Sequence, residues 1–411
     1  MSNHPNGSPS PDRERGSGGE VLALLALIAA CARPAPHDFA ITHVTVVDVA
    51  HNALLHDRTI VIDGARIMQV DTSPHVALSR RTPTLDGTGR FVIPGLWDMH
   101  VHLSDSATAA QLLWWGITGA RVMSGPLDKT LALRERLRNN PTLGPRLVAA
   151  GLALHGKESF ASDTGLALVQ SAADARRAVD SLARRGVDFI KVHEGLSRDA
   201  WFAIAQSAAQ HDLRLAGHVP AGLSAETLSA HGLTSIEHLE FLPDACLVIF
   251  DSTTRARHSA PSGCRQADLH LLLERLHGNG VWLDPTISSF RVFAPRQFPS
   301  ILAGFADLAV QIRDAGLPIM AGTDLGSAGI VPGESLHDEL GLLVASGYTP
   351  VEALRAATIN PATYLQAADT LGRVAAGYVA DLVVLQANPL ADIHNTRRIV
   401  AVIRAGALLA H

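Results

Sequence analysis

The sequence has no surplus of positive charge. Its 34 lysine and arginine residues are outnumbered by 39 aspartate and glutamate residues, which gives a net charge of −5 over 411 residues. A chain without a basic field lacks the electrostatic footprint of nucleic-acid binding and of attraction to anionic lipid. We therefore expect neither class of partner. The hydrophobic fraction of 47% instead fits a globular protein with a large core.

Apolar runs of membrane-spanning length are also missing. The run at residues 21–30, VLALLALIAA, is far shorter than the roughly 20 residues that a transmembrane helix needs. Arginines precede it and Cys31 follows, a pattern typical of an export signal with Cys31 as the lipidated first mature residue. We expect residues 1–38 to be this leader and a linker, in an exported, periplasmic or membrane-anchored lipoprotein. Glu20 and the long polar leader favour the alternative, a cytoplasmic protein.

Cysteine is scarce, with three residues in the whole chain. If Cys31 carries lipid, Cys246 and Cys264 remain, and an oxidising compartment could join them in a disulfide. Two separate buried thiols are the alternative. Neither cysteine has the spacing of a zinc or redox motif. Both lie at the insert 241–265, which could form a lid or a pocket wall.

Short apolar strands alternate with helical segments from Pro94 onward. The expected strands are 96–102, 117–123, 146–154, 188–193, 214–219, 235–239, 281–286 and 318–324. The expected helices include 172–185, 197–211, 223–231, 266–279 and 300–315, and a helical region at 335–367 would complete the ring. This alternation is typical of a (β/α)8 TIM barrel over residues 94–367. A doubly wound open sheet, the competing architecture, usually carries a glycine-rich phosphate-binding turn after its first strand, and this sequence lacks one there.

Strand patterns also occupy both ends of the ordered chain. Residues 39–50 alternate and are rich in β-branched side chains, and Asp63-Gly64 lies between two such runs, which predicts a hairpin. Strand character returns after residue 368. These strands are too few to form a domain alone. We therefore expect residues 39–93 and 368–411 to form one small β-sandwich-like domain built from both termini.

The stretch FVIPGLWDMHVHL, residues 91–103, organises the rest of the chain. Side chains of equal parity share one face of a strand, so Asp98, His100 and His102 point the same way. Two imidazoles two residues apart can hold one metal ion from one side. Asp98 lies a layer deeper and is expected to support the ligands instead of binding metal.

Further polar residues end other strands, at the place where barrel enzymes position their chemistry. They are Lys191 in an apolar setting, His218, His238 and Asp324. Each alone has a structural explanation, such as a hydrogen-bonded histidine or a lysine that reaches the rim. Together with His100 and His102 they are typical of a metal site.

At this point the sequence resembles the amidohydrolase superfamily. The segments GLWDMHVHL, DFIKVH, AGHVP, SIEHLE and AGTD match its strand signatures in order, and LGRVAAGYVADLVVL is similar to its return to a flanking sheet. The resemblance covers roughly residues 39–411. It is greatest to the prolidase-like and imidazolonepropionase-related branch, which contains dipeptidases of the Xaa-Pro type.

The resemblance implies a centre with two divalent metal ions. His100, His102 and Asp324 would hold the more buried ion, His218 and His238 the other, and Lys191, carboxylated by CO2, would bridge them. A hydroxide shared by the ions would be the nucleophile, since metal binding lowers the pKa of water. Asp324 would accept its proton and pass it to the leaving amine. Zinc suits nitrogen and oxygen ligands best, with manganese or cobalt as alternatives.

Substrate contacts are harder to predict. His193 should stand above Lys191 on the same face, His155 follows the third strand, and Arg121 could be a carboxylate clamp at the end of the second. Each has an equal structural explanation. His337, with Glu334, is expected at the start of a helix without a chemical role.

We therefore expect a binuclear metal hydrolase that cleaves an amide or peptide bond in a dipeptide, Xaa-Pro-like substrate or N-acyl amino acid. The first alternative is hydrolysis of cyclic amides or lactones. The second is an inactive amidohydrolase fold that serves as a binding protein. Lys191 argues against the deaminase branches, which generally use one metal and lack this lysine. A homo-oligomer is compatible with the sequence.

Overall fold

The computed structural model describes residues 37–157, 164–238, 266–296 and 298–410. Cys31, Cys246, Cys264 and the insert 241–265 lie outside these ranges. Lipidation at Cys31, the disulfide and the lid therefore stay predictions. Within the described ranges, no helix combines the length and the apolar character required to span a membrane.

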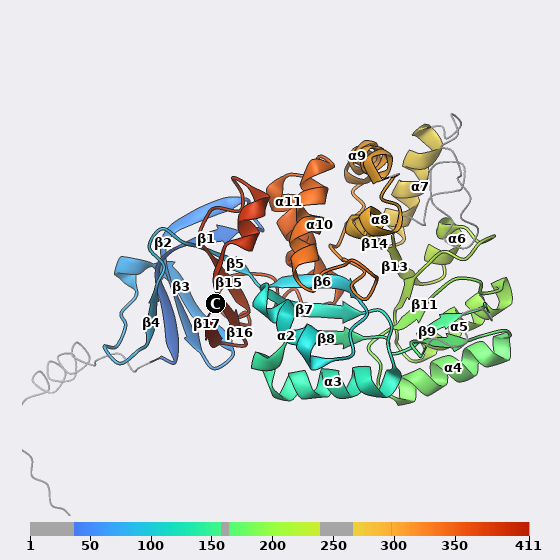
Figure 1. Cartoon of the computed structure of the whole chain (residues 1–411), viewed down its shortest axis with the longest axis horizontal. Coiled ribbons are helices and arrows are strands. Elements are labelled where there is room, and N and C mark those ends of the chain that lie inside the picture. Colours follow the sequence, from blue (N-terminus) through green and yellow to red (C-terminus); the bar gives the residue numbers. More distant parts are fainter. Residues whose placement is uncertain (1–36, 158–163, 239–265, 297, 411) are drawn as a thin grey trace, which may run out of the picture.

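Strands from both ends of the chain form one sheet of eight strands. They are β1 (Phe39–Asp48), β2 (Ala53–Asp63), β3 (Arg66–Thr72), β4 (Thr84–Asp86), β5 (Phe91–Pro94), β15 (Leu382–Leu385), β16 (Ile399–Arg404) and β17 (Ala407–Ala410). The antiparallel pairing of β15 with β5 joins the two ends, with Val384 opposite Val92. Figure 1 shows the blue and red strands together on one side of the molecule. In hydrogen-bonding terms this is a single sheet and not the two sheets of a sandwich.

Parallel strands build the central part of the molecule. Three form one sheet, β6 (Leu96–Val101), β7 (Ile117–Val122) and β8 (Arg146–Ala149). Six form another in the order β10 (Leu166–Leu168), β9 (Ala153–His155), β11 (Ile190–Val192), β12 (Leu215–Gly217), β13 (Leu233–Glu237) and β14 (Trp282–Asp284). Since all these pairings are parallel, the strands end on one common edge.

Two strand predictions need correction. The expected strand 146–154 is two strands, β8 and β9, because Gly151 between them has φ +75°, a conformation that interrupts a strand. The expected strand 318–324 is not a regular strand. It still bonds on both sides: Met320 N donates to Leu283 O of β14 (2.7 Å), and Asp324 N donates to His100 O of β6 (2.9 Å).

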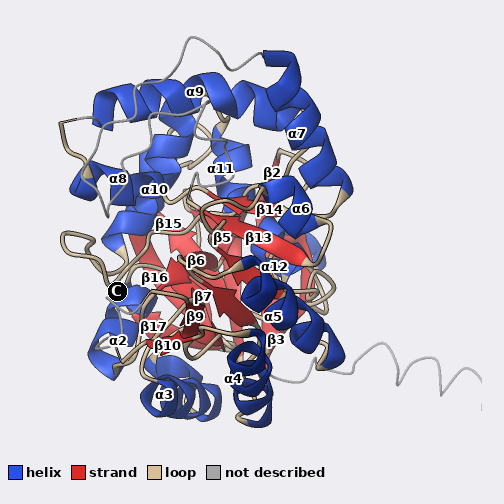
Figure 2. Ribbon diagram, turned by 90° about the vertical axis from the view of Figure 1, so that its right-hand side faces the viewer, coloured by secondary structure: helices blue, strands red, loops and turns tan. Residues whose placement is uncertain are grey.

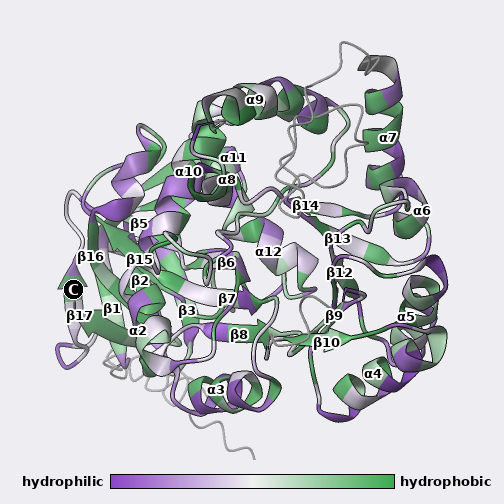
Figure 3. Ribbon diagram, turned by 45° about the vertical axis from the view of Figure 1, so that its right-hand side comes forward, coloured by the Kyte–Doolittle hydropathy of each residue, from purple (hydrophilic) through white to green (hydrophobic). Residues whose placement is uncertain are grey.

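Helices surround the parallel strands (Figure 2). They are α2 (Ser106–Trp114), α3 (Leu127–Asn139), α4 (Ala172–Arg184), α5 (Arg198–Gln210), α6 (Ala225–Ser229), α7 (Gln266–Gly278), α8 (Ile287–Phe293), α9 (Phe298–Asp314), α10 (Glu334–Ala345), α11 (Pro350–Ala356) and α12 (Ile359–Tyr364). The five predicted helices between 172 and 315 are thus confirmed, with small shifts at their ends. In α4, Ala175, Val179 and Leu182 are buried, and hydrophilic and hydrophobic residues alternate around the helix in Figure 3. This spacing is that of an amphipathic helix on a core.

Helix starts follow the expected capping chemistry. The side chains of Asp105, Ser171, Ser197 and Ser224 each accept a hydrogen bond from the third backbone N–H of the helix that follows. The buried His337 in α10 has a connecting role. Its Nε2 donates to Trp115 O (3.0 Å), and its Nδ1 lies 2.9 Å from Thr396 Oγ1 in the 3-10 helix η4 (Ile393–Arg397).

We expect His337 to make stability depend on acid pH. Burial lowers the pKa of His337 to about 4 from 6.5, so between these values the unfolded chain binds more protons than the folded one. The free energy of unfolding should therefore fall as pH falls from 6.5 to 4, by about 3 kcal/mol from this residue. Urea unfolding across this window should show a shallower pH dependence for His337→Gln than for wild type. His51→Gln, at a side chain that is 74% exposed, is the control and should keep the wild-type slope; equal slopes for all three proteins would contradict the assignment.

Candidate metal centre

A cavity of about 600 Å³ opens at the carboxyl ends of the parallel strands. Seven of the residues singled out from the sequence line it: His100, His102, Lys191, His193, His218, His238 and Asp324. They come from β6, the ends of β11 to β13, and the segment after β14. The fold thus brings together side chains that lie more than two hundred residues apart in the sequence.

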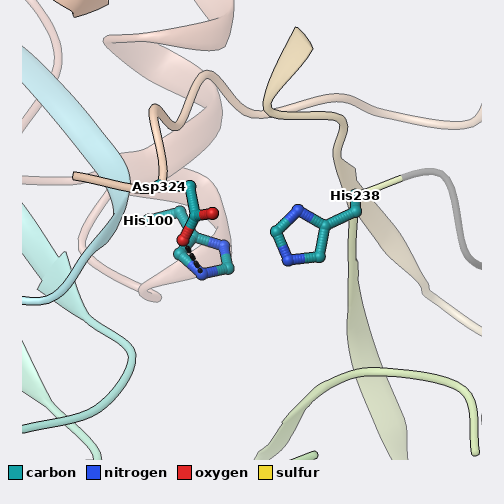
Figure 4. A group of neighbouring side chains, drawn as sticks. All are labelled: His100, His238 and Asp324. Atoms are coloured by element: carbon teal, nitrogen blue, oxygen red, sulfur yellow. Dashed lines mark ion pairs between the residues drawn. The ribbon is translucent and has the colours of Figure 1, made fainter. Parts of the chain in front are cut away.

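Asp324 lies between His100 of β6 and His102, which follows this strand. Its Oδ1 is 3.1 Å from Nε2 of His102 and 3.4 Å from Nε2 of His100. His238 faces this group, with its ring centroid 4.9 Å from that of His100 and 5.0 Å from that of His218. Ligand atoms of His100, His238 and Asp324 lie within 4.8 Å of one another (Figure 4). This is a spacing at which one metal ion could bind all three.

Each of three histidines has its Nδ1 engaged by a residue behind it. Nδ1 of His100 donates to Glu237 Oε2 (3.0 Å), and Nδ1 of His102 is 2.7 Å from Ser124 Oγ. Nδ1 of His238 is 2.7 Å from Thr286 Oγ1. Such contacts fix the orientation of each ring, and the carboxylate of Glu237 also fixes the tautomer of His100, so that Nε2 is the atom left to bind a metal ion.

Burial favours the neutral form of four histidines in the cavity, His100, His193, His218 and His238. Burial lowers the pKa of His100 and of His193 to about 3, and it lowers the pKa values of His218 and His238 as well. The positive charge of Lys191 lowers all four pKa values further. Burial alone would raise the pKa of Asp324, but the hydrogen bond from His102 and the neighbouring histidines outweigh it and lower this pKa. Neutral imidazoles with one carboxylate are a donor set that fits zinc and related divalent ions.

Backbone strain is also found at this site, which holds three of the nine non-glycine residues with positive φ in the described part of the chain. His238, Thr286 and Asp324 have φ values of +58°, +44° and +61°. Each such non-glycine residue costs on the order of 1–3 kcal/mol, and proteins keep this strain mainly at functional sites. His238 and Asp324 directly line the cavity, so the strain accompanies the positioning of two candidate ligands.

The predicted substrate clamp at Arg121 is wrong. Arg121 is fully buried and does not line the cavity. It lies beneath the ligands, where it donates to Glu237 Oε2 (2.8 Å), Asp284 Oδ2 (3.3 Å) and Met99 O (2.6 Å). The sequence pattern of a strand does not distinguish a polar residue that faces the substrate from one that pairs with a buried carboxylate beneath the cavity.

Glu237 and Asp284 are therefore site residues that the sequence reading missed. Glu237 supports His100 and directly precedes His238, which is a usable signal; Asp284, within VWLDPT, gives no comparable one. Ligand atoms of His100, Glu237 and Asp284 also lie within 4.8 Å of one another. The guanidinium of Arg121 already supplies the positive charge there, so these carboxylates support the centre from below.

The other predicted residues fall on different layers. His193 stands in the cavity with its ring centroid 4.3 Å from that of His218. His155 is fully buried and is not among the lining residues, although it is close enough to lower the pKa of His193. Asp98 lies below the ligands and accepts from Thr323 Oγ1 (2.7 Å) and from His100 N (3.2 Å).

Glu237→Gln should weaken metal binding more than Asp284→Asn. Burial would raise the pKa of Glu237, but Arg121 and His100 lower it, so Glu237 is charged. Burial and the charge of Glu237 raise the pKa of Asp284. Replacing Asp284 by the neutral asparagine therefore removes less negative charge from beneath the centre. We expect Glu237→Gln to lower zinc affinity by roughly 10–100-fold, measured by competition with a chelator. A larger loss in Asp284→Asn would contradict this division of roles.

Comparison with known proteins agrees with the geometry. A model of the Amidohydrolase family matches residues 91–409. The chain is 26% identical to imidazolonepropionase of Porphyromonas gingivalis over 359 residues, which cover 74% of this chain and 76% of the relative. It is 24% identical to ochratoxinase of Aspergillus niger over 374 residues, which cover 74% of this chain and 71% of the relative.

Solved structures place the fold in the same group. A Bifidobacterium longum protein described as a candidate prolidase superposes with a TM-score of 0.75 at 28% identity, over 92% of this chain and 95% of that one. A Xaa-Pro dipeptidase with bound methionine gives a TM-score of 0.75 at 21% identity, over 91% and 100%, and supports the fold alone. These prolidase-like neighbours imply a TIM-barrel-like α/β architecture. The chain belongs to the amidohydrolase family, and it is a hydrolase that acts on carbon–nitrogen bonds.

Proposed function

We propose that this chain binds two divalent metal ions and hydrolyses an amide bond with an apolar group on one side. The observation that carries the proposal is the gathering of four histidines, Lys191 and Asp324 around one cavity. The proposal includes a closed (β/α)8 barrel over residues 94–367, supported by the bonds of residues 318–325 to both β14 and β6. It also includes a terminal domain of residues 39–93 and 368–411, supported by their shared sheet.

The residues would divide the ions between them. His100, His102 and Asp324 would hold one ion, and His218 and His238 the other. Lys191 is 1% exposed and lies among these histidines, where an ammonium group would oppose metal binding. We therefore propose that the ammonium group loses one proton, and that the neutral Nζ then reacts with CO2 to form a carbamate with loss of a second proton; a positive charge would thus be replaced by an anion that both ions could share.

Two bound ions would supply a water of lowered pKa and polarise the scissile carbonyl. Asp324 is placed to hold and transfer a proton: Ser327 Oγ donates to its Oδ2 (3.0 Å), which fixes the carboxylate. Zinc is the proposed metal because its preferred ligands are imidazole nitrogen and carboxylate oxygen.

One wall of the cavity is apolar. Phe290, Phe293 and Ala294, from α8 and the residue that follows it, line this wall, and Leu166 lies elsewhere on the lining. Phe293 is 51% exposed, so its ring is accessible to a substrate in the cavity. No arginine lies among the described lining residues. The wall therefore favours a substrate that offers an aromatic or branched apolar group. The ochratoxinase relative is in line with an amide substrate; the imidazolonepropionase relative favours the cyclic amide as the second candidate.

Phe290→Ala should lower kcat/KM for a bulky apolar substrate by roughly 10–100-fold, mainly through KM, because burying a phenyl group against this wall contributes about 1.5–3 kcal/mol. A substrate with a methyl group in the same position should change by less. Phe202→Ala is the matched control, since Phe202 lies on α5 and packs on His231, outside the cavity lining. Equal losses of kcat/KM for both substrates would contradict a role of Phe290 in binding the apolar group.

A hydrolysis panel on zinc-loaded protein tests the proposal. The panel holds Xaa-Pro and other dipeptides, N-acyl amino acids with apolar acyl groups, cyclic amides and lactones, with Asp324→Asn as the blank. We expect turnover of linear amides that is absent in the blank. Turnover of cyclic amides or lactones alone would contradict the linear-amide proposal and favour the cyclic-amide alternative. Silence across the panel in protein that carries no metal would favour the inactive binding fold.

A further inference from the structure

A second cavity of about 600 Å³ lies at the opposite ends of the parallel strands. Arg146 is the first residue of β8, Arg214 directly precedes β12, and Trp97 is near the start of β6; all three line it. The terminal sheet contributes Arg66, the first residue of β3. Because the metal ligands lie at the other ends of these strands, this cavity is separate from the metal centre.

The arginines of this cavity have little negative charge opposite them. Arg66 donates to the backbone oxygen of Gly377 (2.6 Å), and Arg214 donates to the backbone oxygen of Tyr364 and stacks 4.6 Å above its ring. These partners are neutral. Both guanidinium groups are therefore held in place by neutral partners that do not offset their positive charge.

Arg146 is only weakly compensated. Its nearest carboxylate, Asp381, is 4.0 Å away and already accepts from Arg404 (2.9 Å). Its Nε is buried and has no hydrogen-bond partner among the described residues. The side chain of Arg146 is 41% exposed, so an anion in the cavity can reach this guanidinium group and accept a hydrogen bond from it.

One carboxylate is found among the described residues that line this cavity, and it is already neutralised. Asp188 Oδ2 accepts from Arg134 (2.6 Å) and from Ala149 N (2.8 Å). The cavity thus presents three guanidinium groups, in a chain whose net charge is −5. This local positive field opposes the sign of the whole molecule.

The floor of the cavity is apolar. Trp97 and Leu371 belong to a small buried core cluster at this end of the strands, and Val148, Leu365 and Val379 pack against it while half-buried. All five line the cavity. Apolar surface beneath fixed polar groups, in a volume of 300–1,000 Å³, is typical of small-molecule sites.

We propose that this cavity binds an organic anion, with its apolar body on the floor and a carboxylate or phosphate head on the arginines. The guanidinium fork matches the planar oxygens of both head groups. The ligand would lie between the parallel strands and the terminal sheet and contact both. This site goes beyond the proposed hydrolysis and does not depend on it.

Calorimetric titration of the zinc-loaded full chain tests the site, with phenyl phosphate and phenylacetate as probes. Arg146→Gln and Arg214→Gln should each raise the dissociation constant of one binding event by roughly 10–100-fold, since each removes a charged hydrogen bond. Arg177→Gln is the control, because Arg177 on α4 is 71% exposed and pairs with Asp174. An oxyanion on the metal centre would not respond to these changes on the opposite face.

The two probes identify the head group. Loss of one event for either probe in the cavity variants, with the control unchanged, supports the site. Identical titrations for wild type and all variants, or no binding of either probe, would overturn it. If Arg146→Gln and Arg214→Gln fail to fold, Arg66→Gln decides, since Arg66 is exposed and its guanidinium group donates to a backbone oxygen, so its replacement should leave the fold intact.

Discussion

Lys191→Ala is expected to lose one of two bound metal ions and at least about 10²-fold in turnover. Mutation of residues that only support metal ligands usually lowers metal affinity or activity by 10–100-fold. Lys191 is proposed to contact both ions directly, so its loss should cost at least as much. Its side chain is 1% exposed among the cavity histidines, whose pKa values it lowers. Metal analysis together with kinetics on the same preparation measures both losses. Added acetate or formate should restore part of the activity by supplying the missing anion.

Lys129→Ala is the matched control for this result. Lys129 is an exposed lysine on α3, and its removal should change neither metal content nor turnover. If Lys191→Ala retained two ions and wild-type turnover, the bridging role would be wrong. Restored activity with acetate but not with chloride would separate loss of an anionic ligand from general damage to the core.

Asp324→Asn is expected to lower kcat by roughly 10²–10⁴-fold, the usual contribution of a positioned general base. The substitution keeps the shape of the side chain, so the fold should survive. Asparagine cannot accept the proton that the reaction releases, and it binds metal less well than a carboxylate. Metal content measured alongside kcat distinguishes these two causes.

Asp314→Asn provides the comparison for Asp324→Asn. Asp314 is exposed at the end of α9, so its amide variant should behave as wild type. An Asp324→Asn protein with full metal content and undiminished kcat would exclude Asp324 as the base. A protein with full metal content and a large loss of kcat would support the proton-transfer role directly.

The gathering of the candidate ligand residues in one cavity could be predicted because it follows from local rules. Strand parity places His100 and His102 on one face, and strand ends meet at one edge when strands are parallel. Neither rule requires knowledge of which strands are neighbours. The five helices predicted between 172 and 315 could be predicted for the same reason, since their apolar spacing is local; α4, α5 and α6 also begin after a capping serine.

The layer beneath the ligands could not be predicted in this way. Arg121 pairs with Glu237 and Asp284, which follow it by 116 and 163 residues. Which of two polar layers a strand residue joins depends on the register between strands, and the sequence does not display it. The same limit applies to residues 318–324, which were expected to form a strand. They bond to β14 and β6 without forming a regular ladder, and local spacing does not show this difference.

The apolar wall was missed because α8 is short and begins in an unusual way. It spans seven residues and follows Thr286, whose φ is +44°. No capping side chain announces its start, and seven residues are too few for a clear helical period. Its phenylalanines acquire meaning only once the helix is seen beside the cavity.

Metal content of the purified full-length chain tests the central claim most directly. Elemental analysis should find two divalent ions per chain, and a chelator should abolish amide hydrolysis, which returns as zinc is restored. One ion per chain would contradict the binuclear centre. Hydrolysis that persists after complete removal of metal would contradict the metal-dependent mechanism itself.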